Sequence, residues 1–266
     1  MNYWTKLSAD FARQRNYLDE LYKVYPITPN LRRELSESKE SKIRAAFESR
    51  NNTALVKELL SLDLFPVKDS YVAYLKRDKT AIDRNPQTVS RIAGNLFQLG
   101  IDEMLEKCTE PKETNRQIGP MFKRWVDGGS LGAPVFKDGE QFLNFKGNCI
   151  LNSSDADMQK FARKYLGFHR EKGIDFVAKF SGKYVIGEAK FITDMGGHQN
   201  AQFDDAVRTM QSSFEDKTVE NEVIPIAIAD GVLFIKGRHK LYRYLEQNSH
   251  QTIISALLLR EFLYSL

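Results

Sequence analysis

The sequence contains little cysteine and no long apolar run, and both shortages narrow the class of protein. Only Cys108 and Cys149 occur among the 266 residues, with no C-x-x-C pair, which argues against structural zinc and favours a reducing cytoplasm with both thiols as packing residues. No apolar stretch reaches the roughly 18 residues that a membrane helix needs. Residues 1–6 lack the apolar core of a secretory signal. We therefore expect a cytoplasmic protein with no membrane partner.

Histidine is also scarce, and the charge excess is small. His169, His239 and His250 show no spacing typical of metal ligands. The formal net charge is +4 and the sequence pI is about 8.8, which permits binding to a polyanion without requiring it. Hydrophobic residues make up 42% and charged residues 28% of the chain, as in ordinary globular proteins. A chain of this length forms one large domain or two smaller ones.

The first 110 residues have the periodicity of helices. Apolar residues recur at helical spacing over residues 4–22, and further helical segments are expected over 31–47, 53–62 and 88–108. Pro26, Pro29 and Pro66 end segments of this region. We predict a helical region over residues 1–110, for which dimerisation and DNA contact are the two alternatives.

Residues 111–266 have the pattern of an α/β domain. An irregular, glycine- and proline-rich segment over 111–154 comes first, and a helix over 155–166 follows, with Ser154 near its start and Gly167 at its end. Strands are expected over 174–180 and 184–191, joined by a tight turn at Ser181-Gly182. A helix over 201–214 and strands over 223–229 and 232–236 come next, and the segments 241–245 and 252–263 are predicted to be helical. The order predicts an α/β fold with a mixed sheet flanked by helices.

Three charged residues on the two predicted strands carry the chemistry. Side chains two apart on a strand point to the same face, so Glu188 and Lys190 project together, and Asp175 comes alongside them if the strands form a hairpin. Two carboxylates are suited to a hard cation such as Mg²⁺. The cation would polarise a phosphate, and the lysine would orient water or steady the developing charge.

These residues resemble the PD-(D/E)XK nuclease superfamily, and in particular the type II restriction endonucleases. Ile174-Asp175 stands for the Pro-Asp pair, with isoleucine in place of proline, and Glu188-Ala189-Lys190 matches the second motif after 188 − 175 = 13 positions. The resemblance covers roughly residues 155–240. It implies a restriction-endonuclease-like core over residues 111–266 and sequence-specific cleavage of double-stranded DNA that leaves 5′-phosphates. It also implies Mg²⁺ held by Asp175, Glu188 and the Ala189 carbonyl, with Lys190 positioning water, and a homodimer.

Two polar segments are candidate DNA contacts. Residues 191–200 look like a loop that these endonucleases carry after the lysine, and the alternative is a plain turn into a helix. Cations and amides in the irregular segment suit phosphate and base contacts, and the alternative there is a solvated basic loop. The candidate residues are Asp194, Gly196, Gly197, His198, Gln199, Asn200, Arg116, Gln117, Lys123 and Arg124.

Three acids near the motif are candidate auxiliary ligands, namely Asp155, Asp157 and Glu171. Two other functions remain open at this point. One is a structure-selective nuclease such as a junction resolvase or repair nuclease, and the other is a non-catalytic DNA-binding protein on a degenerate nuclease core. The complete set of Asp175, Glu188 and Lys190 argues against the second.

Overall fold

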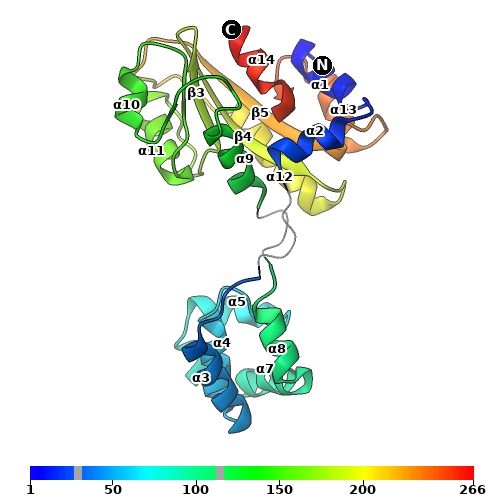
Figure 1. The fold of residues 1–266 in the computed structure, drawn as a ribbon, viewed down its shortest axis with the longest axis vertical. Coiled ribbons are helices and arrows are strands. Elements are labelled where there is room, and N and C mark those ends of the chain that lie inside the picture. The colour runs from blue at the N-terminus through cyan, green and yellow to red at the C-terminus, as the bar shows by residue number, and fades with distance from the viewer. Residues whose placement is uncertain (27–31, 112–116) are drawn as a thin grey trace. The chain divides into compact units, whose positions relative to one another are not determined.

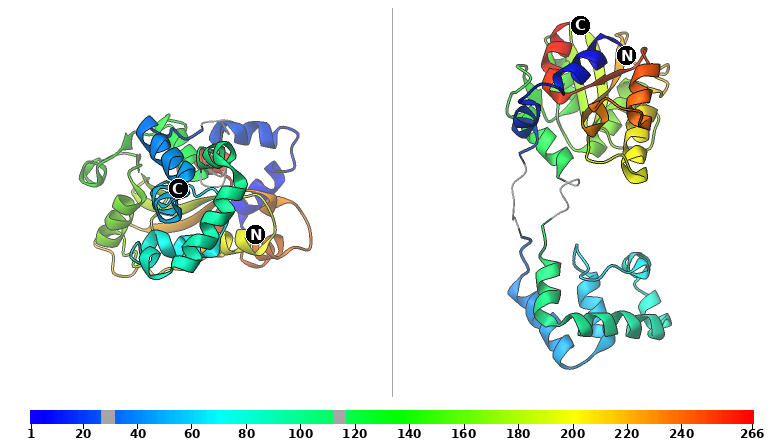
Figure 2. Two further views of the ribbon diagram at one scale, coloured as in Figure 1. Left: turned by 90° about the horizontal axis from the view of Figure 1, so that it is seen from below. Right: turned by 90° about the vertical axis from the view of Figure 1, so that its right-hand side faces the viewer.

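The chain forms two compact units, and the sequence of one is inserted into that of the other. The computed structural model describes residues 1–26, 32–111 and 117–266. The α/β unit contains Met1–Ile27 and Glu113–Leu266, and the helical unit contains Thr28–Lys112. Both chain termini lie in the α/β unit (Figures 1 and 2). The helical region predicted for residues 1–110 is therefore divided between the two units, which corrects its N-terminal boundary.

The α/β unit is built on one six-stranded mixed sheet with strand order β1-β2-β3-β4-β5-β6 (Figure 1). The strands are β1 (Val135–Phe136), β2 (Cys149–Leu151), β3 (Phe176–Phe180), β4 (Lys183–Ile192), β5 (Val223–Gly231) and β6 (Thr252–Ile254). The pairs β2–β3 and β3–β4 are antiparallel, and the other three are parallel. The predicted α/β class with a mixed sheet is confirmed.

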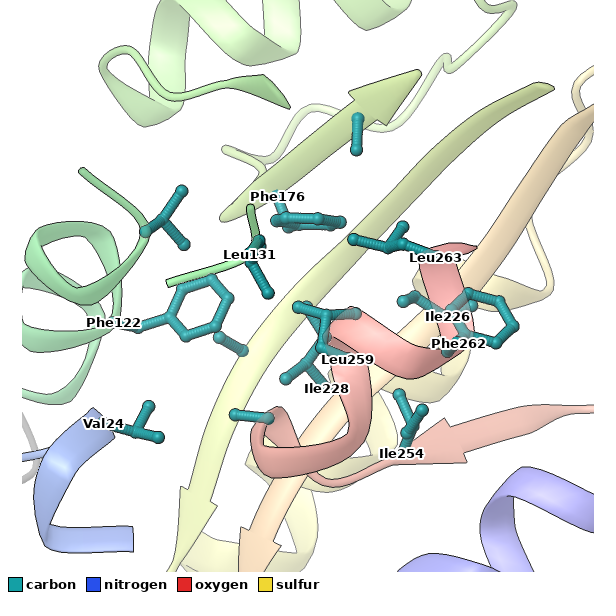
Figure 3. Close-up of a cluster of buried hydrophobic side chains, with 14 of the residues drawn as sticks. Val24, Phe122, Leu131, Phe176, Ile226, Ile228, Ile254, Leu259, Phe262 and Leu263 are labelled. Atoms are coloured by element: carbon teal, nitrogen blue, oxygen red, sulfur yellow. The ribbon is translucent and has the colours of Figure 1, made fainter. Parts of the chain in front are cut away.

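Helices cover both faces of this sheet. They are α1 (Tyr3–Phe11), α2 (Tyr17–Val24), α9 (Ile118–Asp127), α10 (Gly139–Asn144), α11 (Asp155–Tyr165), α12 (Gly197–Met210), α13 (Lys240–Gln247) and α14 (Leu259–Tyr264). On one face, α2, α9 and α14 share a core with Val185 and Ala189 of β4 (Figure 3). On the other face, α10 and α11 share a core with Ile186, and α12 and α13 with Ile192. Alternation along β4 therefore directs Glu188 and Lys190 toward the face that α12 covers.

The N-terminal segment is attached to the sheet by buried hydrogen bonds. The Thr5 hydroxyl accepts the Ile253 N–H at 3.1 Å. The Tyr17 and Tyr25 hydroxyls donate to the fully buried carboxylate of Asp230 at 3.3 and 3.1 Å. These bonds explain why residues 1–27 belong to the α/β unit although their periodicity is purely helical.

The helical unit has its own apolar core. Its helices are α3 (Glu37–Glu48), α4 (Asn52–Leu60), α5 (Ser70–Arg77), α6 (Ala81–Arg84), α7 (Pro86–Leu99) and α8 (Ile101–Cys108). Leu55 and Leu59 of α4 pack with Ile92 and Leu96 of α7. The helix predicted over 88–108 is two helices, because the backbone at Gly100 has φ +85°, a conformation that interrupts a right-handed helix.

Other local predictions also differ from the structure. The predicted strand 232–236 is instead a 3₁₀ turn, η2 (Val232–Phe234), because β5 ends at Gly231 with φ +94°. The predicted helix 252–263 begins as strand β6, followed by η3 (Ala256–Leu258) and α14, because Ile253 and Ile254 pair with β5. The segment 111–154, predicted to be irregular, holds α9, β1, α10 and β2.

Cys108 and Cys149 are free and buried. Burial raises the pKa of each thiol to about 11, so both remain protonated near neutral pH and act as small packing residues. In the part of the chain that the structure describes, no helix has the length and apolar character needed to span a membrane.

Candidate active site

The β3–β4 hairpin accounts for the spacing between Asp175 and Glu188. Its ladder runs from Phe180↔Lys183 to Phe176↔Gly187, so the next step places Asp175 opposite Glu188. The turn residues Ser181 and Gly182 have φ of +49° and +78°, the left-handed conformation that a two-residue hairpin turn requires. Opposed residues of an antiparallel pair lie on the same face. Asp175 and Glu188, although 13 positions apart in sequence, are thus direct neighbours across the two strands.

Lys190 joins the two carboxylates. Its Nζ lies 3.0 Å from Glu188 Oε2 and 3.4 Å from Asp175 Oδ2. The Ala189 N–H donates to Asp175 Oδ2 at 2.9 Å, which fixes the orientation of that carboxylate. The structure therefore brings all three predicted catalytic residues to one place, with Ala189 between them.

Burial and charge act in opposite directions on these groups. Burial raises the pKa of Asp175, since the loss of hydration outweighs the attraction of Lys190 and the hydrogen bond from Ala189. Burial alone would lower the pKa of Lys190, but its two carboxylate neighbours outweigh burial and raise it. Lys190 is therefore a cation near neutral pH.

A pocket of about 260 Å³ opens beside these residues. It is lined by residues of α9, β4 and α12 together with Asp175, namely Ile118, Gly119, Asp175, Ala189, Lys190, Phe191, Gln202 and Asp205. A phosphate that entered it would meet the Lys190 ammonium group and the carboxylates of Asp175 and Asp205. An ammonium group next to carboxylates suits the hydrolysis of a phosphodiester in which a cation is bound between the carboxylates and the phosphate.

The sequence analysis missed a second group of residues around Glu188. The side chain of Glu188 is fully buried, and its Oε2 accepts from Lys172 Nζ at 2.5 Å while Thr209 Oγ1 donates to Oε1. Asp205 of α12 accepts from Lys172 and from Arg170, the latter at 2.9 Å. The spacing of Asp205 and Thr209, four residues apart on a helix, places them on one face, but nothing in the sequence relates that face to Lys172.

The three auxiliary acids take other partners. Asp155 pairs with Lys123, Asp157 with Lys160 at 3.1 Å, and Glu171 with Arg163 at 3.3 Å. Asp155 is near enough to contribute to the raised pKa of Asp175. Over residues 1–26, 32–111 and 117–266, no group of three or more histidine, cysteine, aspartate or glutamate side chains is arranged to hold a metal ion.

The candidate DNA-contact loop is the turn into α12. Gln199 is buried and its Oε1 accepts the Thr193 N–H at 3.3 Å, and Asn200 Nδ2 donates to the Met195 carbonyl at 3.2 Å. These two amides thus serve the turn itself. Asp194, Gly196 and Gly197 are exposed, and the side chain of His198 lies outside the described part of the structure.

The basic candidates near α9 have different surroundings. Lys123 donates to the Ser153 carbonyl at 2.7 Å and pairs with Asp155, so its charge is used within the unit. Arg124 is exposed, and Gln117 directly precedes α9. Arg116 lies outside the described residues.

The chain is similar to one known family over almost its whole length. Residues 2–266 match the family described as Tsp45I type II restriction enzyme. The chain belongs to this family. It is therefore a site-specific deoxyribonuclease of the type II restriction class, as the motif predicted. No curated protein and no solved structure gave a significant match.

Proposed function

We propose that this restriction endonuclease cleaves double-stranded DNA in a Mg²⁺-dependent reaction that leaves 5′-phosphates and 3′-hydroxyls. The observation that carries the proposal is the position of Lys190, whose Nζ contacts the carboxylates of both Asp175 and Glu188 beside a pocket. The cytoplasm is the proposed compartment, since both cysteines are free thiols.

The oxygens at this place fit a magnesium ion. Two carboxylate oxygens, one each from Asp175 and Glu188, already converge on one positive charge. Ala189 directs its N–H to Asp175, and the N–H and C=O of one strand residue point to the same side, so its carbonyl is the third proposed ligand. Mg²⁺ commonly uses one or two carboxylates and keeps its other positions for water and substrate phosphate, which explains how it binds without a cluster of three acids.

The residues have separate roles in the proposed reaction. When bound, Mg²⁺ would supply Lewis-acid polarisation of the phosphate and lower the pKa of coordinated water. Lys190 hydrogen-bonds the attacking water and stabilises charge on the phosphoryl oxygens. Asp175 is held in place by the Ala189 N–H, and Glu188 by Thr209 and Lys172.

The proposed DNA contacts fall into two groups by exposure. Arg124, Asp194, Gly196 and Gly197 are exposed and are available for phosphate or base contact. Lys123, Gln199 and Asn200 would act by fixing the loops that present the first group, since they bond within the unit. The proposed set also includes Arg116, Gln117 and His198.

We also propose a homodimer, with the helical unit as the dimer surface or DNA clamp. Helix α5 exposes Tyr71 and Tyr74, and the Arg91 guanidinium carbon lies 5.4 Å from the Tyr71 ring centroid. Sedimentation equilibrium and DNA binding in Ca²⁺ of a Tyr71→Ser/Tyr74→Ser variant separate the two roles. Loss of the dimer assigns α5 to dimerisation, and loss of DNA affinity with the dimer intact assigns it to the clamp. A variant that keeps both the dimer and the DNA affinity of wild type would contradict both proposed roles of α5.

Incubation of plasmid DNA with the protein and MgCl₂ tests the proposed reaction. Discrete bands that disappear with EDTA and with Glu188→Gln, but persist with the surface variant Lys160→Met, are the expected result. End-labelling of the products should give 5′-phosphates. Preference for branched DNA would instead identify a structure-selective nuclease, and binding without cleavage would identify a non-catalytic DNA-binding protein.

A further inference from the structure

Glu188 is surrounded by more positive charge than one carboxylate balances. Its Oε2 accepts from both Lys172, at 2.5 Å, and Lys190, at 3.0 Å. Arg170 Nη1 lies 4.0 Å from Oε1, which also accepts from Thr209. Both oxygens of this fully buried carboxylate are therefore occupied by donors of the chain itself.

The second partner of Lys172 distinguishes it from Lys190. Lys172 Nζ also contacts Asp205 Oδ2, and Arg170 Nη2 pairs with Asp205 Oδ1 at 2.9 Å. Hydrogen bonds from Lys172 and Arg170 outweigh partial burial and lower the pKa of Asp205. Asp205 also lines the pocket that contains Asp175 and Lys190. Lys172 thus lies between Glu188 and a second carboxylate, and its side chain is 28% exposed.

A divalent cation that binds Glu188 Oε2, the oxygen nearest Lys190, needs a lone pair that an ammonium group now occupies, and like charges at this distance repel. Lys190 contacts both proposed ligands and orients water in the proposed reaction. Lys172 has Asp205 as an alternative partner, so it can leave Glu188 without becoming an unpaired charge.

We propose that Lys172 is a displaceable counter-ion: it neutralises Glu188 before the metal binds, and it releases Glu188 and keeps Asp205 as its partner when the metal arrives. The inference rests on the proposed function of Asp175 and Glu188 as metal ligands. Lys172 and Asp205 are positioning residues in this arrangement, because both act through the charge at Glu188. Buried negative charge that lacks a matching positive charge is destabilising. Without Lys172, the carboxylates of Asp175, Glu188 and Asp205 would share, among the described residues, only the cations Lys190 and Arg170, so Lys172 stabilises the metal-free site at the expense of metal affinity.

Thermal unfolding of the full chain with MgCl₂ alone, without DNA and at constant ionic strength, tests the inference. The two tryptophans of the chain, Trp4 and Trp125, both lie in the α/β unit, so their fluorescence reports on the unit that holds the site. Lys172→Met should melt below wild type in EDTA. Its half-saturating Mg²⁺ concentration should fall about tenfold, within the usual range of coupling between two sites. The surface variant Lys160→Met should behave as wild type.

For Asp205→Asn we expect the opposite change in the half-saturating Mg²⁺ concentration. This second variant tests the inference even if Lys172→Met does not fold. Without the alternative carboxylate, Lys172 stays on Glu188, and the half-saturating Mg²⁺ concentration should rise. In the Lys172→Met background, Asp205→Asn should have no further effect, whereas a direct metal ligand would weaken binding in both backgrounds. Equal Mg²⁺ responses in wild type and Lys172→Met, or unchanged affinity in Asp205→Asn, would overturn the inference. No Mg²⁺ response in any variant would overturn the proposed metal site as well.

Discussion

The fully buried carboxylate of Asp230 predicts an unusual pH dependence of stability. It accepts hydrogen bonds from Tyr17, Tyr25, Ser255 and the Ala256 N–H. Burial nevertheless raises its pKa from 3.8 to about 6, because the lost hydration outweighs these bonds. A carboxyl group whose folded pKa is raised binds a proton more tightly in the folded state. Its contribution to stability is therefore complete below pH 3.8 and is lost as the pH rises through about 6.

The size of the effect follows from the two pKa values. The full difference corresponds to about 3 kcal/mol, and about 1.4 kcal/mol of it falls between pH 8 and pH 5. Asp230→Asn removes the titration and keeps the shape of the side chain. The free energy of unfolding of wild type, minus that of the variant, should therefore increase by about 1.4 kcal/mol from pH 8 to pH 5.

Urea unfolding followed by tryptophan fluorescence measures this difference, since Trp4 and Trp125 both lie in the α/β unit. Glu222→Gln, which removes an exposed carboxylate paired with Lys183, is the control for the loss of one negative charge. A wild-type-minus-variant difference that stays constant with pH, or that grows toward pH 8, would refute the reasoning.

Three further predictions concern the β4 strand. Glu188→Gln should slow plasmid cleavage by about 10³-fold or more, because it removes a carboxylate of the proposed metal site. Lys190→Met should slow it by at least about 10²-fold, because it removes the ammonium group that stabilises charge at the reacting phosphate. Gel assays of initial rates check both, and wild-type rates would contradict the assigned roles. Gly187→Ala should lower the free energy of unfolding by about 1–3 kcal/mol, because a Cβ at Gly187 would lie 2.7 Å from the Ile226 carbonyl oxygen of β5. Urea unfolding followed by tryptophan fluorescence measures the free energy of unfolding. An unchanged midpoint would show that β5 shifts to accommodate the added methyl group without loss of stability.

Local patterns were sufficient to predict the β3–β4 hairpin that carries the proposed site. The turn at Ser181-Gly182 sets the register, and the register alone places Asp175 opposite Glu188. The helix start at Ser154 was also predictable, because its hydroxyl accepts the Asp157 N–H in the usual N-cap manner. The long apolar run over 223–229 identified β5 as a buried strand.

Features that depend on distant packing could not be predicted in this way. Lys172, Asp205 and Thr209 meet at Glu188 only because α12 packs on β4. The segment before Pro26 shows helical periodicity, and its packing in the core of the α/β unit and its bonds to Asp230 and Ile253 assign it to that unit. Strand β6 is three residues long and next to helical sequence, so its pairing with β5 decides its conformation.

A crystal structure of the protein with Mn²⁺ and DNA containing its recognition sequence tests the central claim most directly. Anomalous scattering locates the metal independently of any assumption about its ligands. We expect a peak about 2 Å from carboxylate oxygens of both Asp175 and Glu188, the distance at which carboxylates bind small hard divalent ions, with the Lys190 ammonium beside the same phosphate. A metal bound elsewhere on the chain, with these three side chains making no contact with it or with the DNA, would contradict it.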